Sequence, residues 1–380
     1  MQRLALSWLV YRLSGSAKLL AAVDFSSQFT AFLMMPIAGV VLDRLDLRRT
    51  LAFTQTLALV QAVALGLLTL SGVVQIWHLM IMGVFLGLIN SFDMPGRHSF
   101  VVRLVDRKED LVNAIALNSS IFNAARLIGP SLAGITVAIF GEGVCFFLNA
   151  ASFIPIIYVL ASMNMIEPRR STRREPFWSG LKDGLKYAYR NSVIRPILIL
   201  VSLISFLGLS FVVLMPVFAK EILKGGADTQ GFLMGALGLG ALGGSIFLAS
   251  RKDVAAIENT FGYAFILFGL GMGAFAWSSN VGLSMLIMIF VGFWMIAGWA
   301  AATSLLQYYV DDDKRSRVMS LFLMCFMGMS PLGSLLMGYL SERISAPVTL
   351  TLSCAFCILG SLFFFPRKQK PTDVKQEATL

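Results

Sequence analysis

The chain has 380 residues, of which 57% are hydrophobic and only 14% charged, and its formal net charge is +10. This composition excludes the water-soluble classes and fits a protein that crosses a membrane many times. A basic chain can also bind nucleic acid, but that function needs a soluble basic domain, and the sequence offers none. Lipid supplies no hydrogen bonds to the backbone, so the spans must be helices, and we expect an all-α integral membrane protein.

The chain opens with a short apolar segment, Met1–Tyr11, about half the length of a membrane span. It lacks the cleavage pattern of a signal peptide. We interpret it as the outer half of a first helix, so that a complete protein has twelve spans. Either translation starts upstream and adds about 15–20 residues, or the chain is a truncated product. The regular pattern of the later spans favours the upstream start.

About 20 mostly apolar residues cross a bilayer core as a helix, and runs of this length recur along the rest of the chain. The predicted spans are residues 18–42, 50–71, 74–96, 111–140, 143–163, 194–219, 230–250, 257–277, 280–303, 317–340 and 346–365.

The basic residues fall mainly on alternate loops between these spans. By our count about 24 of the 31 lysines and arginines lie on one side of the membrane. Loops rich in lysine and arginine stay in the cytoplasm. We therefore expect that side, with the C-terminus, to be cytoplasmic.

The longest polar stretch, Glu167–Arg195, separates two sets of six spans. Within it Phe177, Leu181, Leu185 and Ala188 recur at helical spacing, which indicates an amphipathic helix on the membrane surface. We expect a linker that holds the two halves together rather than a lipid or partner sensor. The predicted domains are a helical bundle at 1–166, the linker at 167–192, a second bundle at 193–366 and a cytoplasmic tail at 367–380.

The two halves also share a weak internal repeat. Gly129–Gly134 matches Gly333–Gly338 at a shift of 204 residues, and Val105–Asp106 matches Val310–Asp311 at nearly the same shift. Parallel repeats of this kind build transporters from two bundles around a central cavity. We expect two six-helix bundles.

A charged motif follows the first complete span. Glycine there lets helices approach closely, and an aspartate beside arginines can latch neighbouring helix ends. The motif resembles the signature of the major facilitator superfamily between its second and third helices, with Asp46 where that signature has a second glycine. Its residues are Gly39, Asp43, Arg44, Arg48 and Arg49.

Two further segments, Asn90–Arg97 and Asn123–Gly134, are similar to the branch of that superfamily that contains the enterobactin exporters and macrolide-efflux relatives. The resemblance implies the major facilitator fold. In the first segment Asp93, Pro95 and Arg97 lie at the inner rim, where we expect gating contacts with Asp43 or Arg44.

The second segment resembles the antiporter motif of exporters through Arg126, Gly129, Pro130 and Gly134. Proline removes a helix hydrogen bond and glycine permits close packing, so this helix is expected to bend and to seal against the other half. Ala125 departs from the motif, and glycine and proline are in any case common in membrane helices.

Polar residues inside spans are costly, so each is a candidate functional residue. Asp24 lies roughly 9 Å deep from the outside and Arg126 roughly 22 Å from the inside, so the two are at comparable depth. They are either an ion pair or separate proton and substrate sites, unless Asp24 simply reaches the outer membrane interface. The side-chain amides of Gln28, Asn118 and Asn123 either bind substrate or, as the more common case, hold helices together. The candidates are Asp24, Gln28, Asn118, Asn123 and Arg126.

Other chemistry is scarce. There is no phosphate-binding loop for ATP, and Cys354 and Cys357 lack further metal ligands nearby, so we expect no metal, no cofactor and no enzyme. The resemblance implies a monomeric secondary transporter of the bacterial inner membrane that exports a small amphipathic molecule by alternating access, coupled to protons. Siderophores, macrolides and other drugs are the implied substrates. The alternatives are translocation of lysophospholipids or other lipid-like solutes, and a transport-dead receptor or assembly factor.

Overall fold

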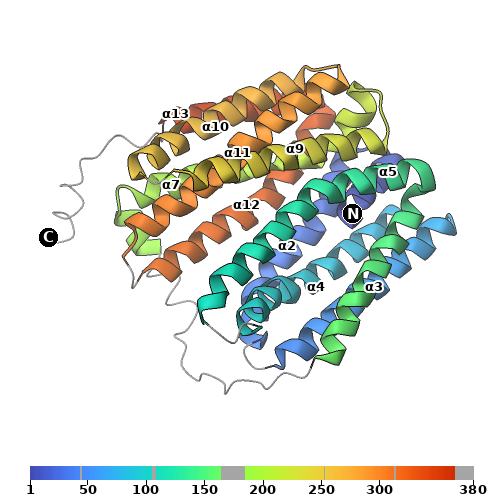
Figure 1. Cartoon of the computed structure of the whole chain (residues 1–380). Helices are drawn as coiled ribbons and strands as arrows, with labels where there is room; N and C mark the ends of the chain where they lie inside the picture. Colours follow the sequence, from blue (N-terminus) through green and yellow to red (C-terminus); the bar gives the residue numbers. More distant parts are fainter. Residues whose placement is uncertain (43–44, 105–107, 164–184, 252, 312–313, 364–380) are drawn as a thin grey trace.

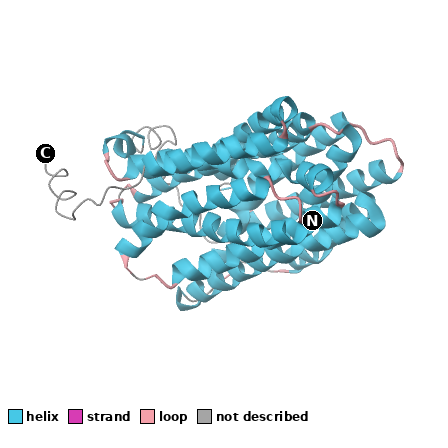
Figure 2. Cartoon of the chain, turned by 90° about the horizontal axis from the view of Figure 1, so that it is seen from above, coloured by secondary structure: helices cyan, strands magenta, loops and turns pink. Residues whose placement is uncertain are grey.

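The computed structural model describes residues 1–42, 45–104, 108–163, 185–251, 253–311 and 314–363. For some residues inside these ranges, Asn118 and Asn123 among them, only the backbone is described. Figure 2 shows that this part of the chain consists of helices and short connections, with no strand among the described residues.

The first bundle consists of α1 (Gln2–Ser14), α2 (Ala17–Leu42), α3 (Leu47–Leu70), α4 (Ile76–Arg103) and α5 (Lys108–Ser162). The long α5 is two helices joined at Gly141, whose φ of 83° and ψ of 169° interrupt the helix. Glycine reaches this positive φ without a steric penalty, which allows an immediate turn back across the bundle.

The second bundle begins with α7 (Ile194–Leu203), which continues through wide and tight turns (Ile204–Leu214), α8 (Met215–Val217) and a last wide turn (Phe218–Ile222). Pro216 lies within this irregular stretch, where it cannot donate a helix hydrogen bond. The bundle is completed by α9 (Ala227–Ala249), α10 (Val254–Ala276), α11 (Val281–Tyr309), α12 (Arg315–Ile344) and α13 (Ala346–Phe363).

Among the described residues, ten helices are long and apolar enough to cross a membrane. One of them is α5, and its two arms on either side of Gly141 correspond to the predicted spans 111–140 and 143–163. All eleven predicted spans are therefore helical, with ends shifted by a few residues. The short α1 has 13 residues, which reach roughly 20 Å at 1.5 Å per residue.

Each half of the chain folds as its own bundle, and the two bundles lie side by side in Figure 1. The bundles meet along two seams, one where α5 packs against α9 and one where α2 packs against α12. The predicted linker helix lies largely outside the described residues. Its described part, 185–190, is helical, with Ala188 buried.

The two seams are built alike, as the repeat predicts. On α5, a Cβ added at Gly134 would lie 2.6 Å from the carbonyl oxygen of Ala227 and 2.8 Å from the Cα of Gly231, both on α9. On α12, a Cβ at Gly338 would lie 2.7 Å from the carbonyl oxygen of Ala17 on α2. Gly134 and Gly338 are equivalent positions of the repeat, so each seam depends on one glycine that lets two backbones touch.

The seams occupy only one half of the molecule. We call the end where α1 meets α2 the α1–α2 end, and the end where α2 meets α3 the α2–α3 end. From the α1–α2 end, the α5–α9 seam extends as far as Gly238 beside Leu127, and the α2–α12 seam as far as Gly328 beside Phe32. Beyond these points, toward the α2–α3 end, the described residues provide no glycine contact or hydrogen bond between the bundles.

Inside the second bundle, α9 and α11 also approach through glycine. A Cβ at Gly240 would collide with the carbonyl of Ile289, one at Gly244 with that of Phe293, and one at Gly292 with that of Leu237. Gly240 and Gly244 are four residues apart, the spacing that places two small residues on one helix face.

We predict that Gly240→Leu destabilises the protein by at least about 1–3 kcal/mol, the usual cost of overpacking, because α9 and α11 cannot separate without breaking the bundle core. Gly273→Leu on α10 is the matched control, since a Cβ there meets nothing within 4 Å. Thermal unfolding of the purified protein in detergent measures both variants. Equal melting temperatures for the two would contradict this account of α9–α11 packing.

Candidate functional site

The aspartate inside α2 has two polar partners. Its Oδ1 is 3.0 Å from Arg3 Nη2 on α1, and its Oδ2 accepts a hydrogen bond of 2.5 Å from Gln28 Nε2, one turn further along α2. The Asp24 side chain is only 17% exposed. The partner of Asp24 is therefore Arg3 and not Arg126. The alternative of an ion pair between Asp24 and Arg126 was wrong, because the depth of a residue does not fix which way its side chain points around the helix.

Arg126 lies in the middle of the first arm of α5 and is exposed. None of the described residues accepts a hydrogen bond from its guanidinium or forms an ion pair with it. Its backbone carbonyl lies at the last contact of the α5–α9 seam, beside Gly238. Arg126 is thus an intramembrane cation placed where the two bundles begin to part.

A chain of carboxamides links four helices, and its buried members Gln2 and Gln61 were not predicted from the sequence. Asn149 Nδ2 donates to Gln2 Oε1 at 2.8 Å, Gln2 Nε2 donates to Gln61 Oε1 at 2.5 Å, and Gln61 Nε2 donates to the carbonyl of Met82 at 3.3 Å. This chain ties α1, α3, α4 and the second arm of α5 together next to Arg3. Glutamines within apolar runs were the available signal, because buried amides need partners.

The predicted gating motif is partly described. Asp43 and Arg44 lie outside the described residues. Arg48 Nη1 donates to the carbonyls of Leu160, Ala161 and Met163 at 3.1, 3.2 and 2.7 Å, which satisfies the open C-terminal end of α5.

The neighbouring residues close the turn into α3. Asp46 is the N-cap of this helix, because its Oδ1 accepts a hydrogen bond from the backbone N–H of Arg49 at 2.9 Å. The side chain of Arg49 also pairs with Asp46 at 3.2 Å. The aspartate at the position of the family's second glycine therefore starts a helix.

The inner-rim motif on α4 is held within its own bundle. The carboxylate of Asp93 is buried and pairs with Arg97 Nε at 2.7 Å, and it accepts hydrogen bonds from Gln55 Nε2 and from Thr54 Oγ1 on α3. Pro95 lies inside α4 between the two charged residues. The expected contacts with Asp43 or Arg44 lie outside the described residues.

The glycines of the two motifs differ in what they do. Gly134 makes the α5–α9 seam, and the carbonyl of Pro130 contacts Gly231 within the same seam. An added Cβ at Gly39 or Gly129 would meet nothing within 4 Å. The close helix approach expected at Gly39 is therefore not seen among the described residues.

Of the predicted substrate amides, Gln28 is bound to Asp24 as described above. The side chains of Asn118 and Asn123 lie outside the described part of the structure, although both positions are helical. The cluster of Arg3, Asp24 and Gln28 and the separate Arg126 are the described polar groups within the spans that best fit a transport site.

Polar contacts between the bundles gather at the α1–α2 end. Glu342 of α12 accepts a hydrogen bond from the Ser16 hydroxyl and another, 3.0 Å long, from the backbone N–H of Lys18. Ser16 itself caps α2 by accepting from the N–H of Leu19 at 3.1 Å. Glu342 therefore supplies a carboxylate from one bundle to the positive end of a helix in the other.

Two more contacts join the bundles nearby. Tyr11 Oη donates to Glu221 at 3.4 Å, and Gln230 Nε2 donates to Ser7 Oγ at 3.0 Å.

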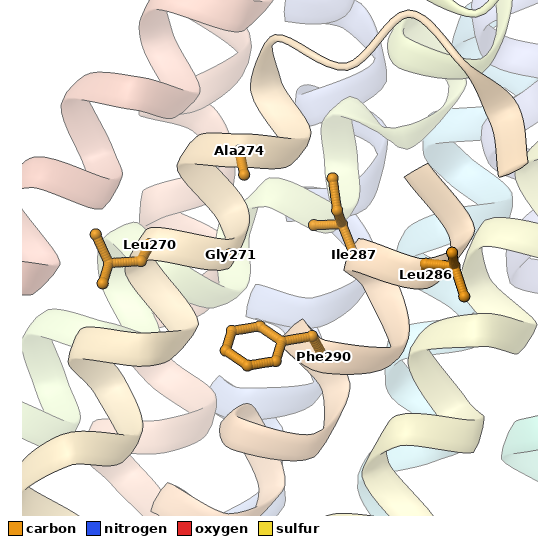
Figure 3. Close-up of a pocket in the computed structure, with 6 residues that line it drawn as sticks. All are labelled: Leu270, Gly271, Ala274, Leu286, Ile287 and Phe290. Atoms are coloured by element: carbon orange, nitrogen blue, oxygen red, sulfur yellow. The ribbon is translucent and has the colours of Figure 1, made fainter. Parts of the chain in front are cut away.

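Two hollows lie away from the polar cluster. An open apolar groove of about 400 Å³ runs between α10 and α11 and is lined by Leu270, Ala274 and Phe290 among others (Figure 3). A second hollow of about 450 Å³ lies at the α1–α2 end beside Trp8, Arg12 and Glu142. Arg12 and Glu142 pair across it at 2.6 Å. The groove of Figure 3 offers no polar side chain to orient a ligand, so its surface suits lipid tails.

Two six-helix bundles that touch along two seams are the architecture of the major facilitator fold. The chain belongs to the transmembrane secretion effector family of this superfamily, whose model matches residues 1–379. It is thus a multi-pass membrane protein that carries a small molecule, and not an enzyme.

Relatives of known name cover almost the whole chain. The staphyloferrin A transporter of Staphylococcus aureus is 24% identical over 97% of this chain and 92% of its own length. The multidrug efflux pump Tap of Mycolicibacterium fortuitum is 26% identical over 96% of this chain and 91% of its own length.

Solved structures show the same fold. A bacterial homologue of the human lysosomal transporter Spinster, in an inward-facing and occupied conformation, superposes with a TM-score of 0.76 at 13% identity, covering 96% of this chain and 92% of that one. The nucleoside transporter NupG has a TM-score of 0.71 at 14% identity, with 97% of each chain covered. The predicted major facilitator fold is confirmed.

We predict that Arg48→Ala lowers the free energy of unfolding by about 1–3 kcal/mol, because three carbonyls at the end of α5 lose a charged donor. Arg49→Ala, the adjacent exposed arginine, should cost about 0–1 kcal/mol, as surface pairs do. Denaturant titration of both variants in detergent gives the comparison. An Arg49 effect as large as that of Arg48 would show that the capped carbonyls are unimportant.

Proposed function

We propose that the protein exports a small amphipathic molecule across the bacterial inner membrane by alternating access, coupled to proton entry. The observation that carries the proposal is the one-sided seam: among the described residues, the glycine contacts and hydrogen bonds between the bundles extend from mid-helix to the α1–α2 end. Rigid bundles of this kind alternate by rocking about a central site, so that one end closes as the other opens.

The basic loops assign the two ends. Lysines and arginines concentrate on the loops of the α2–α3 end, and such loops stay in the cytoplasm. In this assignment the C-terminus is cytoplasmic and the structure is open toward the cytoplasm, the side from which an exporter loads. The helical bundles at 1–166 and 193–366 are the rocking bodies, the segment at 167–192 is the tether between them, and 367–380 is a tail.

The substrate range comes from the relatives. One is a transporter of staphyloferrin A and another a multidrug efflux pump. They support a siderophore, a macrolide or another drug as the exported molecule. Lipid-like solutes and a transport-dead receptor stay as alternatives. Counterflow of a labelled macrolide or siderophore in proteoliposomes separates them, because neither alternative exchanges such a solute.

Proton coupling is assigned to Asp24. It is the carboxylate inside α2 that pairs with Arg3 of α1 and with Gln28. Protonation removes the charge that holds Arg3, so α1 and α2 lose an attraction when a proton arrives. A titratable group whose protonation changes the contact between two helices is what coupling a proton to a conformational change requires.

We predict that Asp24→Asn abolishes export driven by a pH gradient while substrate exchange without a gradient continues, because asparagine carries no titratable proton. Arg3→Lys is the matched control: it keeps the carboxylate and the positive charge that protonation of Asp24 releases, so gradient-driven export should survive. Transport in proteoliposomes with and without an imposed pH gradient measures both. Full gradient-driven export by Asp24→Asn would contradict the assignment of proton coupling to Asp24.

We also predict that Gly134→Leu forces the α1–α2 end open, because the added side chain displaces α9 from α5. Gly129→Leu, five residues earlier on the same helix, should change little, since its Cβ meets no neighbour. Spin labels at the exposed residues Ser71 and Trp277, one on each bundle, report the opening once the four free cysteines are replaced. The distance between the labels should increase in Gly134→Leu alone, and the same distance in both variants would refute the seam as the gate.

A further inference from the structure

The mid-membrane arginine of α5 lacks a counter-ion within the described protein. Three carboxylates of the first bundle already have arginine partners: Asp24 pairs with Arg3, Glu142 with Arg12 and Asp93 with Arg97. Charged side chains inside membranes pair with one another or mark the path of a ligand. Arg126 has no described partner, so its environment calls for an anion from outside the chain.

The side chain of Arg126 also points inward rather than to lipid. At 100° per residue, Ala133 and Val137 lie within about 20° of Arg126 around α5, and both are buried in the main core. Val137 lines the hollow beside Trp8 of α1. The exposed aliphatic residues of α5 fall on the other side of the helix: Leu117, Ile121, Ile128 and Leu132.

The helix that packs beside Arg126 supplies no counter-charge. Where α9 contacts this part of α5 it presents Gly235 and Gly238, and the carbonyl of Arg126 lies 3.0 Å from a Cβ built at Gly238. These glycines let the two backbones touch and contribute no side chain that could neutralise the guanidinium. Arg126 is exposed at the level where the seam ends, so it is accessible from the open α2–α3 end.

We propose that Arg126 binds an acidic group, such as a carboxylate, of the transported molecule, and that the substrates are therefore amphipathic organic anions. This inference rests on the proposed export function. A guanidinium presents paired N–H donors that match a carboxylate. Closing the α2–α3 end over an empty site would bury a lone cation, whereas a bound anion neutralises it, so substrate binding favours the closure that export requires.

Binding of two probes that differ only in charge tests this proposal. The protein in lipid nanodiscs is titrated with pyrenebutyrate and with pyrenebutanol, and energy transfer from the six tryptophans reports binding above that of empty nanodiscs. Wild type should bind the anion about ten- to one-hundredfold more tightly than the alcohol, as charged hydrogen bonds do. Arg126→Gln should lose this preference while keeping its affinity for the alcohol, and Arg126→Lys should keep part of it.

Arg251→Gln is the control, because this exposed arginine beyond the end of α9 lies over the ring of Phe247 at 4.5 Å, and its loss should leave the preference for the anion unchanged. Equal affinities of wild type for the two probes, or an undiminished preference in Arg126→Gln, would overturn the inference. The measurement uses no gradient and no transport. Retained charge selectivity without any export would count against the proposed function alone, so the two proposals fail separately.

Discussion

The fold depends on backbones that touch at two places without intervening side chains. Gly134 on α5 rests on Ala227 and Gly231 of α9, and Gly338 on α12 rests on Ala17 and Ala21 of α2. Between membrane helices there is little hydrophobic driving force, so close packing of small residues supplies most of the attraction. Such contacts are flat and shallow compared with a bundle core, which suits surfaces that must part and rejoin during each transport cycle.

Lipid imposes the second constraint, since a polar group in the membrane needs a partner from the protein. The chain of Asn149, Gln2 and Gln61 meets this demand with neutral amides, and Asp24 meets it with Arg3. These groups fix α1 against the first bundle. The polar groups on that side all have protein partners, whereas Arg126 has none among the described residues.

Sequence reasoning recovered whatever depends on local composition. Span positions follow from apolar run length, and the two bundles follow from the repeat of Gly129–Gly134 in the second half. It failed where a partner on another helix decides the outcome. Neither depth nor motif spacing reveals which helix is adjacent: Asp24 pairs with Arg3, and a Cβ built at Gly39 has no described neighbour within 4 Å. Glu342 went unnoticed because a single acidic residue at a helix end has no distinctive pattern in the sequence.

Glu342 joins the two bundles, which separate at this end in the proposed cycle. The free energy of its contacts therefore adds directly to the stability of the closed conformer. A carboxylate at an exposed helix N-terminus contributes about 0.3–1 kcal/mol, and 1 kcal/mol changes the ratio of two states about fivefold. The carboxylate reaches Ser16 and Lys18 only while the α1–α2 end is closed. Because the interaction lies at an exposed surface, salt weakens it. In the proposed cycle, a higher ionic strength at that face therefore favours opening of the α1–α2 end.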